Sequence, residues 1–181
     1  TYLLKEVVSY YTYNASSVYC TLLDATKAFD RVNFGKLFMV LKERKLPPEI
    51  VRLLLNLYTE HRTRISWNKS HSDTFNVING VKQGGILSPI LFCVYIDGLL
   101  ARLQQSGVGC YIGLCCLAVL AYADDLVILA PTPSAMRNLL SICDSYAAEF
   151  KVKFNASKSK SMMFLPHGCA HNSDQTVPTF H

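Results

Sequence analysis

The stretch AYADDLVILAP, residues 121–131, sets two adjacent carboxylates, Asp124 and Asp125, in the middle of an otherwise apolar run. Neighbouring residues of a β-strand point to opposite faces, so a regular strand cannot direct both side chains to one side. At a tight hairpin turn both carboxylates can project toward a common site. We therefore expect a hairpin with YADD at its tip, which joins the strand candidates CCLAVLAYA and LVILA.

Two carboxylates side by side in a partly dry site need a positive partner, because each raises the pKa of the other and an uncompensated buried charge is costly. Mg²⁺ is the expected partner, since it favours carboxylate oxygens together with water and substrate phosphates. A third acid, Asp24, ends another apolar strand candidate, SVYCTLLD. Asp24, Asp124 and Asp125 are therefore candidate ligands of two ions about 3.5–4 Å apart, a geometry suited to in-line phosphoryl displacement. The alternative is ordinary turn chemistry.

Helical and strand patterns alternate along the first half of the chain. Apolar residues recur at helical spacing in residues 3–11, and SVYCTLL reads as a strand. Asn33 can cap a following helix, and Pro47 and Pro48 separate it from another helix over residues 50–58. The segments TRISW and TFNVI then predict short strands.

The second half continues the alternation. After the Gly-rich loop NGVKQGG, Ser88 is the expected N-cap and Pro89 the first residue of a long helix. The strand hairpin around the two acids follows, and Thr132 with Pro133 opens a helix that reaches Phe150. The segments KVKFN and KSMMFLP predict closing strands. This order favours an α+β fold with helices packed on one face of a mostly antiparallel sheet.

The composition describes a folded domain. Half of the 181 residues are hydrophobic and 17% are charged, which argues against disorder. The chain opens on Thr1 without a signal peptide, so we interpret it as a piece of a longer product. The apolar run 108–123 is too short for a membrane helix and predicts a buried strand pair separated near Gly113. We therefore expect no membrane partner. Seven cysteines without C-x-x-C spacing indicate reduced, intracellular thiols.

Positive charge is concentrated in one part of the chain. The net charge is +5, and residues 27–69 contain ten of the eighteen Lys and Arg residues against four acids. A basic surface of this kind is typical of proteins that bind a phosphate-rich partner. A solvated helix surface explains the charge equally well.

Four motifs, in order, resemble the successive palm motifs of reverse transcriptases of the non-LTR (LINE-type) retrotransposons. They are LLDATKAFDRV at residues 22–32, GVKQGGILSPILF at 80–92, AYADDLVIL at 121–129 and FNASKSKSMMF at 154–164. The resemblance implies a polymerase palm with partial fingers over residues 1–165 and a polar tail over 166–181. Most of the fingers and all of the thumb of the parent polyprotein would then be missing.

The resemblance also implies roles for individual residues. It makes Asp24 and Asp124 the principal metal ligands, Asp125 the third carboxylate, and the backbone carbonyl of Ala25 part of the metal and triphosphate site. Phe29 matches the aromatic gate beneath the sugar that excludes a 2′-hydroxyl.

Three further positions are carried over in the same way. Gln83 and Gly84 match the loop that contacts the incoming nucleotide and the template. Lys158 matches the lysine that can protonate the leaving pyrophosphate, and Lys160 is its rival by spacing alone.

The function that the resemblance implies is RNA-directed DNA synthesis. The domain would extend a DNA primer on an RNA template with deoxynucleoside triphosphates and two Mg²⁺ ions, for which Mn²⁺ can substitute. Its place would be the nucleus and the cytoplasm, within a retrotransposon ribonucleoprotein. Two alternatives stay open: a catalytically inactive remnant that at most binds nucleic acid, and the palm of a group II intron maturase or of telomerase.

Overall fold

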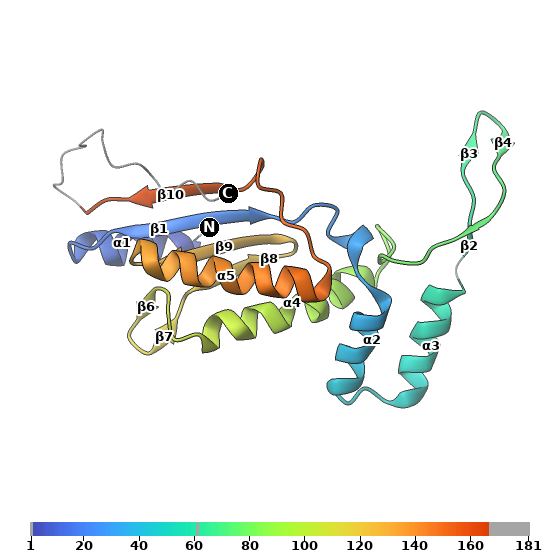
Figure 1. Ribbon diagram of the computed structural model, residues 1–181, viewed down its shortest axis with the longest axis horizontal. Helices are drawn as coiled ribbons and strands as arrows, with labels where there is room; N and C mark the ends of the chain where they lie inside the picture. The colour runs from blue at the N-terminus through green and yellow to red at the C-terminus, as the bar shows by residue number, and fades with distance from the viewer. Residues whose placement is uncertain (1, 61, 167–181) are drawn as a thin grey trace. The chain divides into compact units, whose positions relative to one another are not determined.

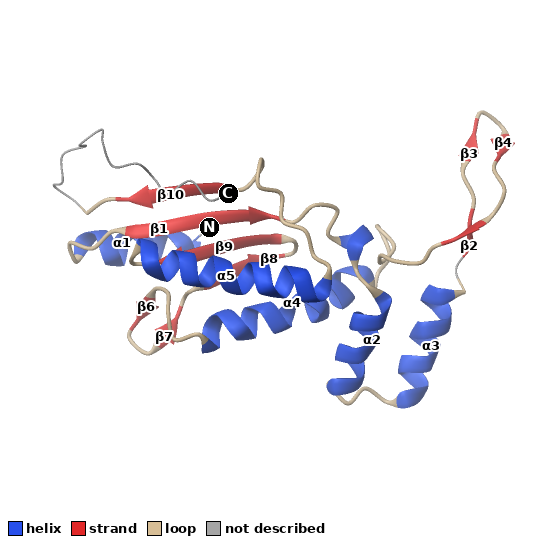
Figure 2. Ribbon diagram, viewed as in Figure 1, coloured by secondary structure: helices blue, strands red, loops and turns tan. Residues whose placement is uncertain are grey.

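The computed structural model describes residues 2–60 and 62–166 and divides them into two compact units. The sheet unit consists of residues 2–26 and 97–166, and the arm unit of residues 27–60 and 62–96. Figure 1 follows the chain through both, and Figure 2 distinguishes their helices from their strands. Within the described residues, no helix combines the length and the apolar character that crossing a bilayer requires.

The sheet unit is built on four strands in the order β10-β1-β9-β8, and each neighbouring pair is antiparallel. The strands are β1 (Val18–Asp24), β8 (Val119–Tyr122), β9 (Asp125–Ala130) and β10 (Lys160–Phe164). The helices are α1 (Tyr2–Tyr13), α5 (Pro133–Phe150) and the second half of α4 (Ser88–Gln105). The predicted α+β class with an antiparallel sheet is therefore confirmed.

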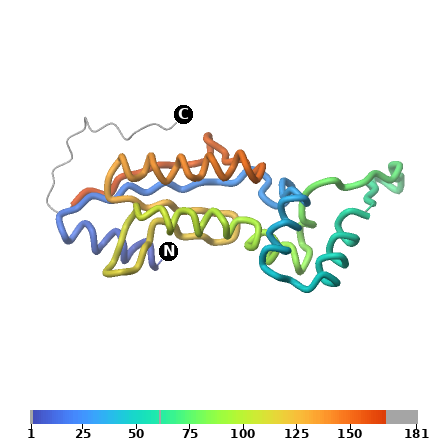
Figure 3. Tube along the Cα trace, turned by 60° about the horizontal axis from the view of Figure 1, so that its bottom comes forward, coloured from blue at the N-terminus to red at the C-terminus, as the bar shows by residue number. Residues whose placement is uncertain are grey.

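Helices cover both faces of this sheet, which corrects the expectation that all of them lie on one face. On one face, Cys20 of β1 and Leu129 of β9 are buried in a cluster with Val7 of α1. On the other face, the Thr21 hydroxyl donates to the sulfur of Met136 in α5, at 3.4 Å. Figure 3 shows α1 and α5 on opposite sides of the sheet. The reason is that β1 is apolar at successive positions, and a strand of that kind needs cover on both sides.

Two strand predictions in this unit are right only in part. The apolar run 108–123 contains the expected strand pair separated at Gly113, formed by β6 (Tyr111–Ile112) and β7 (Cys115–Cys116), but the pair is not buried, and Leu114 at its turn is fully exposed. The predicted strand KVKFN forms only one bridge, between Phe154 and Ala25. Lys151 ends α5 in the left-handed conformation, and the chain then bends back along the end of β1.

The arm unit contains two packed helices and a long hairpin. A 3-10 turn, η1 (Phe29–Arg31), leads to α2 (Phe34–Glu43) and α3 (Pro48–Thr59), where the Phe34 and Tyr58 rings lie 5.8 Å apart. The arm, residues 62–76, follows with β2 (Arg62–Thr63), β3 (Ser66–Trp67), β4 (Ser70–His71) and β5 (Phe75–Asn76). The first half of α4 completes the unit.

The predicted helix starts are confirmed at two sites. The Asn33 side chain accepts from the Lys36 amide at 3.1 Å, and the Thr132 hydroxyl accepts from the Ala135 amide at 3.2 Å. Ser88 begins α4, but its buried hydroxyl donates to the Lys82 carbonyl in the preceding loop. Ser88 therefore ties the Gly-rich loop to the helix, a role that its N-cap position did not reveal.

Candidate functional site

The end of the sheet brings two of the predicted carboxylates face to face. Asp24 is the last residue of β1 and Asp125 the first of β9, and the two are directly opposite in the antiparallel ladder. Directly opposed residues point to the same face, with Cβ atoms about 4.5–5.5 Å apart. Asp24 is half-buried and Asp125 is exposed. Residues about a hundred positions apart in sequence thus share one site.

Asp124 lies in the two-residue turn next to them. Tyr122 and Asp125 are paired across β8 and β9, so Ala123 and Asp124 form the tip of the hairpin as predicted. Ala123 has φ +54°, a conformation that costs an L-residue about 1–2 kcal/mol and that hairpin tips usually give to glycine. Backbone strain is therefore present beside the half-buried Asp124.

The residue types at this end of the sheet fit a hard divalent cation. Carboxylate oxygens are the ligands that Mg²⁺ prefers, and across residues 2–60 and 62–166 no basic side chain forms a salt bridge with Asp24, Asp124 or Asp125. The three carboxylates lie at the same end of the sheet, but their side chains are not arranged to coordinate one ion. In the described part of the chain, no group of three acidic, His or Cys side chains is placed to hold a metal.

The backbone of Asp24 is fixed by the loop that precedes β10. The Asp24 amide donates to the Ser159 hydroxyl at 3.2 Å, and the Asp24 carbonyl accepts from the Asn155 amide at 2.8 Å. Farther on, the Thr26 amide donates to the Lys153 carbonyl at 2.8 Å, and buried Ala25 bridges to Phe154 between these bonds. Sequence reasoning missed the positioning roles of Asn155 and Ser159, although the polar run NAS after Phe154 was a signal for a structured turn.

Both candidate lysines lie at this end of the sheet. Lys160 begins β10 opposite Leu22, and it shares the face of Asp24 because Leu22 and Asp24 are two residues apart on β1. Lys158 lies two residues earlier, in a turn where its amide donates to the Asn155 carbonyl at 3.2 Å. Both side chains are exposed, so the geometry keeps both as candidates.

Tyr122 is a further residue that sequence reasoning missed. It is the direct partner of Asp125 on β8, so Asp24, Asp125 and Tyr122 form one row across three strands. Its ring is 85% exposed. The tyrosine is part of the YADD motif, but only the strand register shows that it lies on the same face of the sheet as Asp24 and Asp125.

Phe29 belongs to the arm unit. Its half-buried ring lies 5.1 Å from that of Phe92 in α4, and its carbonyl accepts from the Val81 amide at 2.8 Å. These contacts connect the 3-10 turn to the Gly-rich loop within one unit.

Gln83 and Gly84 form the tip of that loop. The Gly85 amide donates to the Lys82 carbonyl at 2.9 Å, and Gly84 has φ +78°, as a type II turn requires at this position. A Cβ added to Gly84 would meet no atom within 4 Å, so the glycine serves the backbone conformation and leaves the surface open. Gln83 is exposed and borders a cavity of about 800 Å³, whose lining also includes the Phe34 and Tyr58 rings.

Comparison with known proteins gives consistent matches. The family model described as reverse transcriptase (RNA-dependent DNA polymerase) matches residues 3–179. The retrovirus-related Pol polyprotein from type-1 retrotransposable element R2 of Nasonia vitripennis is 30% identical over 93% of this chain and 16% of its own length. The retrovirus-related Pol polyprotein from type-2 retrotransposable element R2DM of Drosophila melanogaster is 34% identical over 78% of this chain and 13% of its own length.

Solved structures share the fold. A telomerase from Candida albicans in complex with a fragment of telomeric RNA has a TM-score of 0.69 at 11% identity, over 94% of this chain and 31% of that chain. A telomerase from Candida tropicalis has a TM-score of 0.67 at 12% identity, over 90% of this chain and 28% of that chain. At such identities the likeness concerns the fold alone.

Proposed function

This chain belongs to the reverse transcriptase (RNA-dependent DNA polymerase) family, and from that premise we propose that it is the palm, with part of the fingers, of a non-LTR retrotransposon polymerase. The chain spans 16% and 13% of the length of the two R2 relatives described above, so the activity of the whole protein also depends on segments outside this chain. The reaction is the extension of a DNA primer on an RNA template with deoxynucleoside triphosphates. Its other partners are the remaining fingers and the thumb of the parent polyprotein.

The observation that carries this proposal is the directly opposed pair Asp24 and Asp125 beside Asp124 in the turn. These three residues would hold two Mg²⁺ ions, or Mn²⁺ in their place, which supply charge stabilisation to the attacking and leaving oxygens of the phosphoryl transfer. The chain's own contribution is to fix the ligands. Two hydrogen bonds from the loop before β10 hold the Asp24 backbone in place, at the position directly opposite Asp125.

Other residues take the roles that the motifs assign to them. The Ala25 carbonyl would join the metal and triphosphate site, and Lys158, with Lys160 as the alternative, would give a proton to the leaving pyrophosphate. Phe29 would exclude the 2′-hydroxyl of a ribonucleotide by the bulk of its ring. Gln83 and Gly84 would meet nucleotide and template, supported by the open space beside Gly84.

The rival functions are less well supported. The relatives from mobile elements are 30% and 34% identical, whereas the telomerases share only the fold at 11% and 12% identity. A decayed remnant would have no reason to keep Asp24, Asp124 and Asp125 together at one end of the sheet. We further place the active protein in the nucleus and the cytoplasm, within a ribonucleoprotein.

The decisive experiment is primer extension on an RNA template with Mg²⁺. It compares this chain with a flank-restored protein, in which the neighbouring segments of the parent polyprotein are present. Asp124→Asn should abolish extension without loss of fold, because it removes one ligand charge and keeps the side-chain size. Asp144→Asn, at an exposed position on α5, is the matched control and should extend normally. Extension by Asp124→Asn at the wild-type rate would refute the proposal, and an inactive flank-restored protein that still binds template would identify a remnant.

A further inference from the structure

The arm, residues 62–76, is a hairpin that nothing in its own unit covers. Every arm residue except Thr63 is exposed, including Trp67 at 81%, Ile65 at 61% and Phe75 at 47%. A two-stranded hairpin without a covering layer is only marginally stable in water, and gathered exposed apolar side chains mark interaction sites. The arm therefore has the properties of a surface that is completed by a partner.

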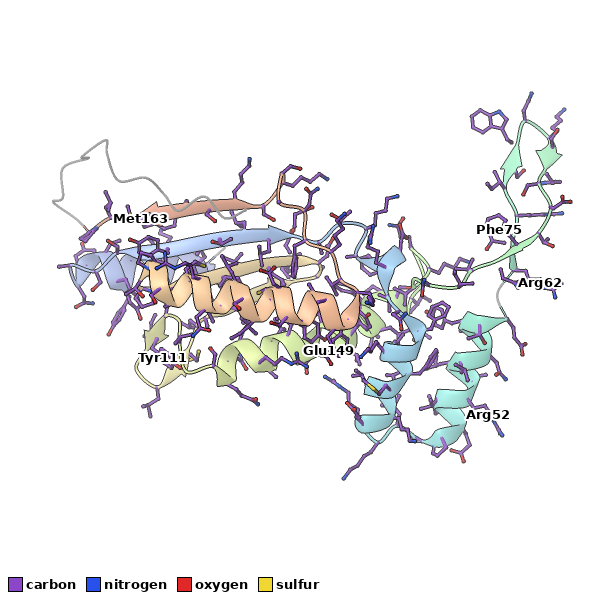
Figure 4. All side chains as sticks on the ribbon, viewed as in Figure 1. Arg52, Arg62, Phe75, Tyr111, Glu149 and Met163 are labelled. Carbon is purple, nitrogen blue, oxygen red and sulfur yellow. The ribbon has the colours of Figure 1, made fainter. Side chains whose placement is uncertain are left out.

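The arm carries two kinds of exposed side chain. In β2, Arg62 and Thr63 point to opposite faces, and in β3, Ser66 and Trp67 do the same; Arg64 and Ile65 connect the two strands. Phe75 is directly opposite Thr63, so it lies on the other face from Arg62. Figure 4 shows Arg62 and Phe75 pointing to opposite sides at the base of the arm. The arm thus combines exposed aromatic and apolar side chains with exposed cations, and at its base the two kinds lie on opposite faces.

The tip of the arm adds a third cation at a conformational cost. Trp67 and Ser70 are paired, and the two residues between them, Asn68 and Lys69, both have positive φ, +44° and +67°. Such turns strongly prefer glycine at the second position. A lysine there is strained, yet it adds a cation to the same turn, two residues after the exposed Trp67. The whole arm contains three Lys and Arg residues against one acid, Asp73, so it carries a net positive charge.

We propose that the arm binds single-stranded nucleic acid, with the Trp67 indole stacked on an unpaired base and Arg62, Arg64 and Lys69 on the flanking phosphates. Stacking on an aromatic ring combined with a cationic backbone track is how proteins hold single strands without reading their sequence. The charge of the arm favours a polyanion over an apolar protein surface. This inference rests on the proposed function in one respect, which is that the natural ligand is an RNA template. Its test requires neither nucleoside triphosphates nor metal ions.

Trp67 is the only tryptophan of the chain, so its fluorescence reports on the arm alone. The full chain is titrated with single-stranded RNA, single-stranded DNA and a fully paired RNA duplex of equal charge. Both single strands should quench the emission, because a stacked base contacts the indole, and the duplex should not. An unchanged emission at saturating single-stranded RNA would overturn the proposal.

Variants give a second readout through the anisotropy of a dye-labelled oligonucleotide. Trp67→Ala should weaken single-strand binding roughly 5- to 150-fold, whereas Trp67→Phe should retain most of it. Leu114→Ala, at a fully exposed apolar position of the sheet unit, is the control and should bind like the wild type. Equal affinity of Trp67→Ala and wild type would exclude stacking.

Lys69→Gly tests the cationic part without risk to the hairpin, because glycine suits the positive φ of that turn position. It should lower the slope of log affinity against log salt by about 0.7, the contribution of one phosphate contact on a single strand.

If Trp67→Ala instead abolishes a concentration-dependent self-association and leaves RNA binding intact, the arm is a protein interface. If RNA binding depends on the arm but the flank-restored protein does not extend a primer, this inference holds and the proposed function is refuted. If extension is normal but Trp67→Ala binds RNA like the wild type, the proposed function holds and this inference is refuted.

Discussion

Asp24 and Asp125 face each other directly across the ladder between β1 and β9, at the end of the sheet where Asp124 occupies the adjoining turn. The strand register alone determines this relationship, because a shift of one residue would turn Asp125 to the opposite face from Asp24. Two like charges in this position destabilise the pair unless a cation lies between them.

The first prediction concerns this pair. Asp24→Asn should raise the free energy of unfolding by about 0.2–1 kcal/mol in metal-free buffer, because the opposed charges are removed. It should also lose the stabilisation that Mg²⁺ or Mn²⁺ gives to the wild type, since an ion that binds only the folded state raises its stability by mass action. Thermal melting with and without each ion measures both effects. A variant that gains as much stability from the ions as the wild type would show that Asp24 is not a ligand.

The second prediction concerns the strained turn. Ala123→Gly should raise stability by about 0.5–1 kcal/mol, because glycine adopts positive φ without the penalty that alanine pays at +54°. Ala121→Gly, at an exposed position of the adjoining strand β8, is the matched control and should lower stability by about 0.5–1 kcal/mol. Chemical denaturation of the wild type and of both variants measures these changes in the free energy of unfolding. A destabilised Ala123→Gly would indicate that the alanine methyl group makes a favourable contact at the tip.

The third prediction separates a nucleotide gate from a core residue. In the flank-restored protein, Phe29→Ala should raise the ratio of ribonucleotide to deoxyribonucleotide incorporation, because space opens for a 2′-hydroxyl. Phe92→Ala removes the buried ring 5.1 Å away and should lower both incorporations together, with a stability loss of about 3–5 kcal/mol. Incorporation assays with parallel thermal melting provide the comparison. An unchanged ratio for Phe29→Ala would make Phe29 a packing residue.

The fourth prediction uses the cysteines. Burial raises the pKa of the Cys20 thiol to about 11, and chiefly the same cause raises those of Cys110 and Cys143 to about 12. A raised pKa keeps these thiols protonated at pH 8, so they should resist alkylation while the exposed Cys93 and Cys115 react. Peptide mass spectrometry after brief iodoacetamide treatment measures the labelling.

The same shifts predict a pH dependence of stability. The unfolded thiols ionise near pH 9.0, so their contribution is complete below that pH and is lost as the pH rises toward 11–12. Melting temperatures recorded from pH 8 to pH 11 should fall at the upper end, and less so in Cys110→Ala. Rapid labelling of Cys110 in the folded protein at pH 8 would contradict the burial that underlies both expectations.

The sequence by itself determined the elements and the family. Its strand periodicity, the caps at Asn33 and Thr132 and the hairpin around YADD are local features, because turn and cap chemistry depends on residues only a few positions apart. The four ordered motifs identified the family, which the match over residues 3–179 confirms. The segment KVKFN, by contrast, has the strand propensity but forms only a single bridge, because too few residues of a neighbouring strand pair with it to make a ladder.

Only the tertiary structure decided which residues meet. The pairing of Asp24 with Asp125, the hydrogen bonds from Asn155 and Ser159 to the Asp24 backbone, and the cover of the sheet by α1 as well as α5 all join segments distant in sequence. Such contacts depend on strand order and register. These are set by the packing of segments far apart in sequence, so no local sequence pattern reveals them. The exposure of Trp67 belongs to the same class, because a strand period shows which residues share a face but not whether any other part of the unit covers it.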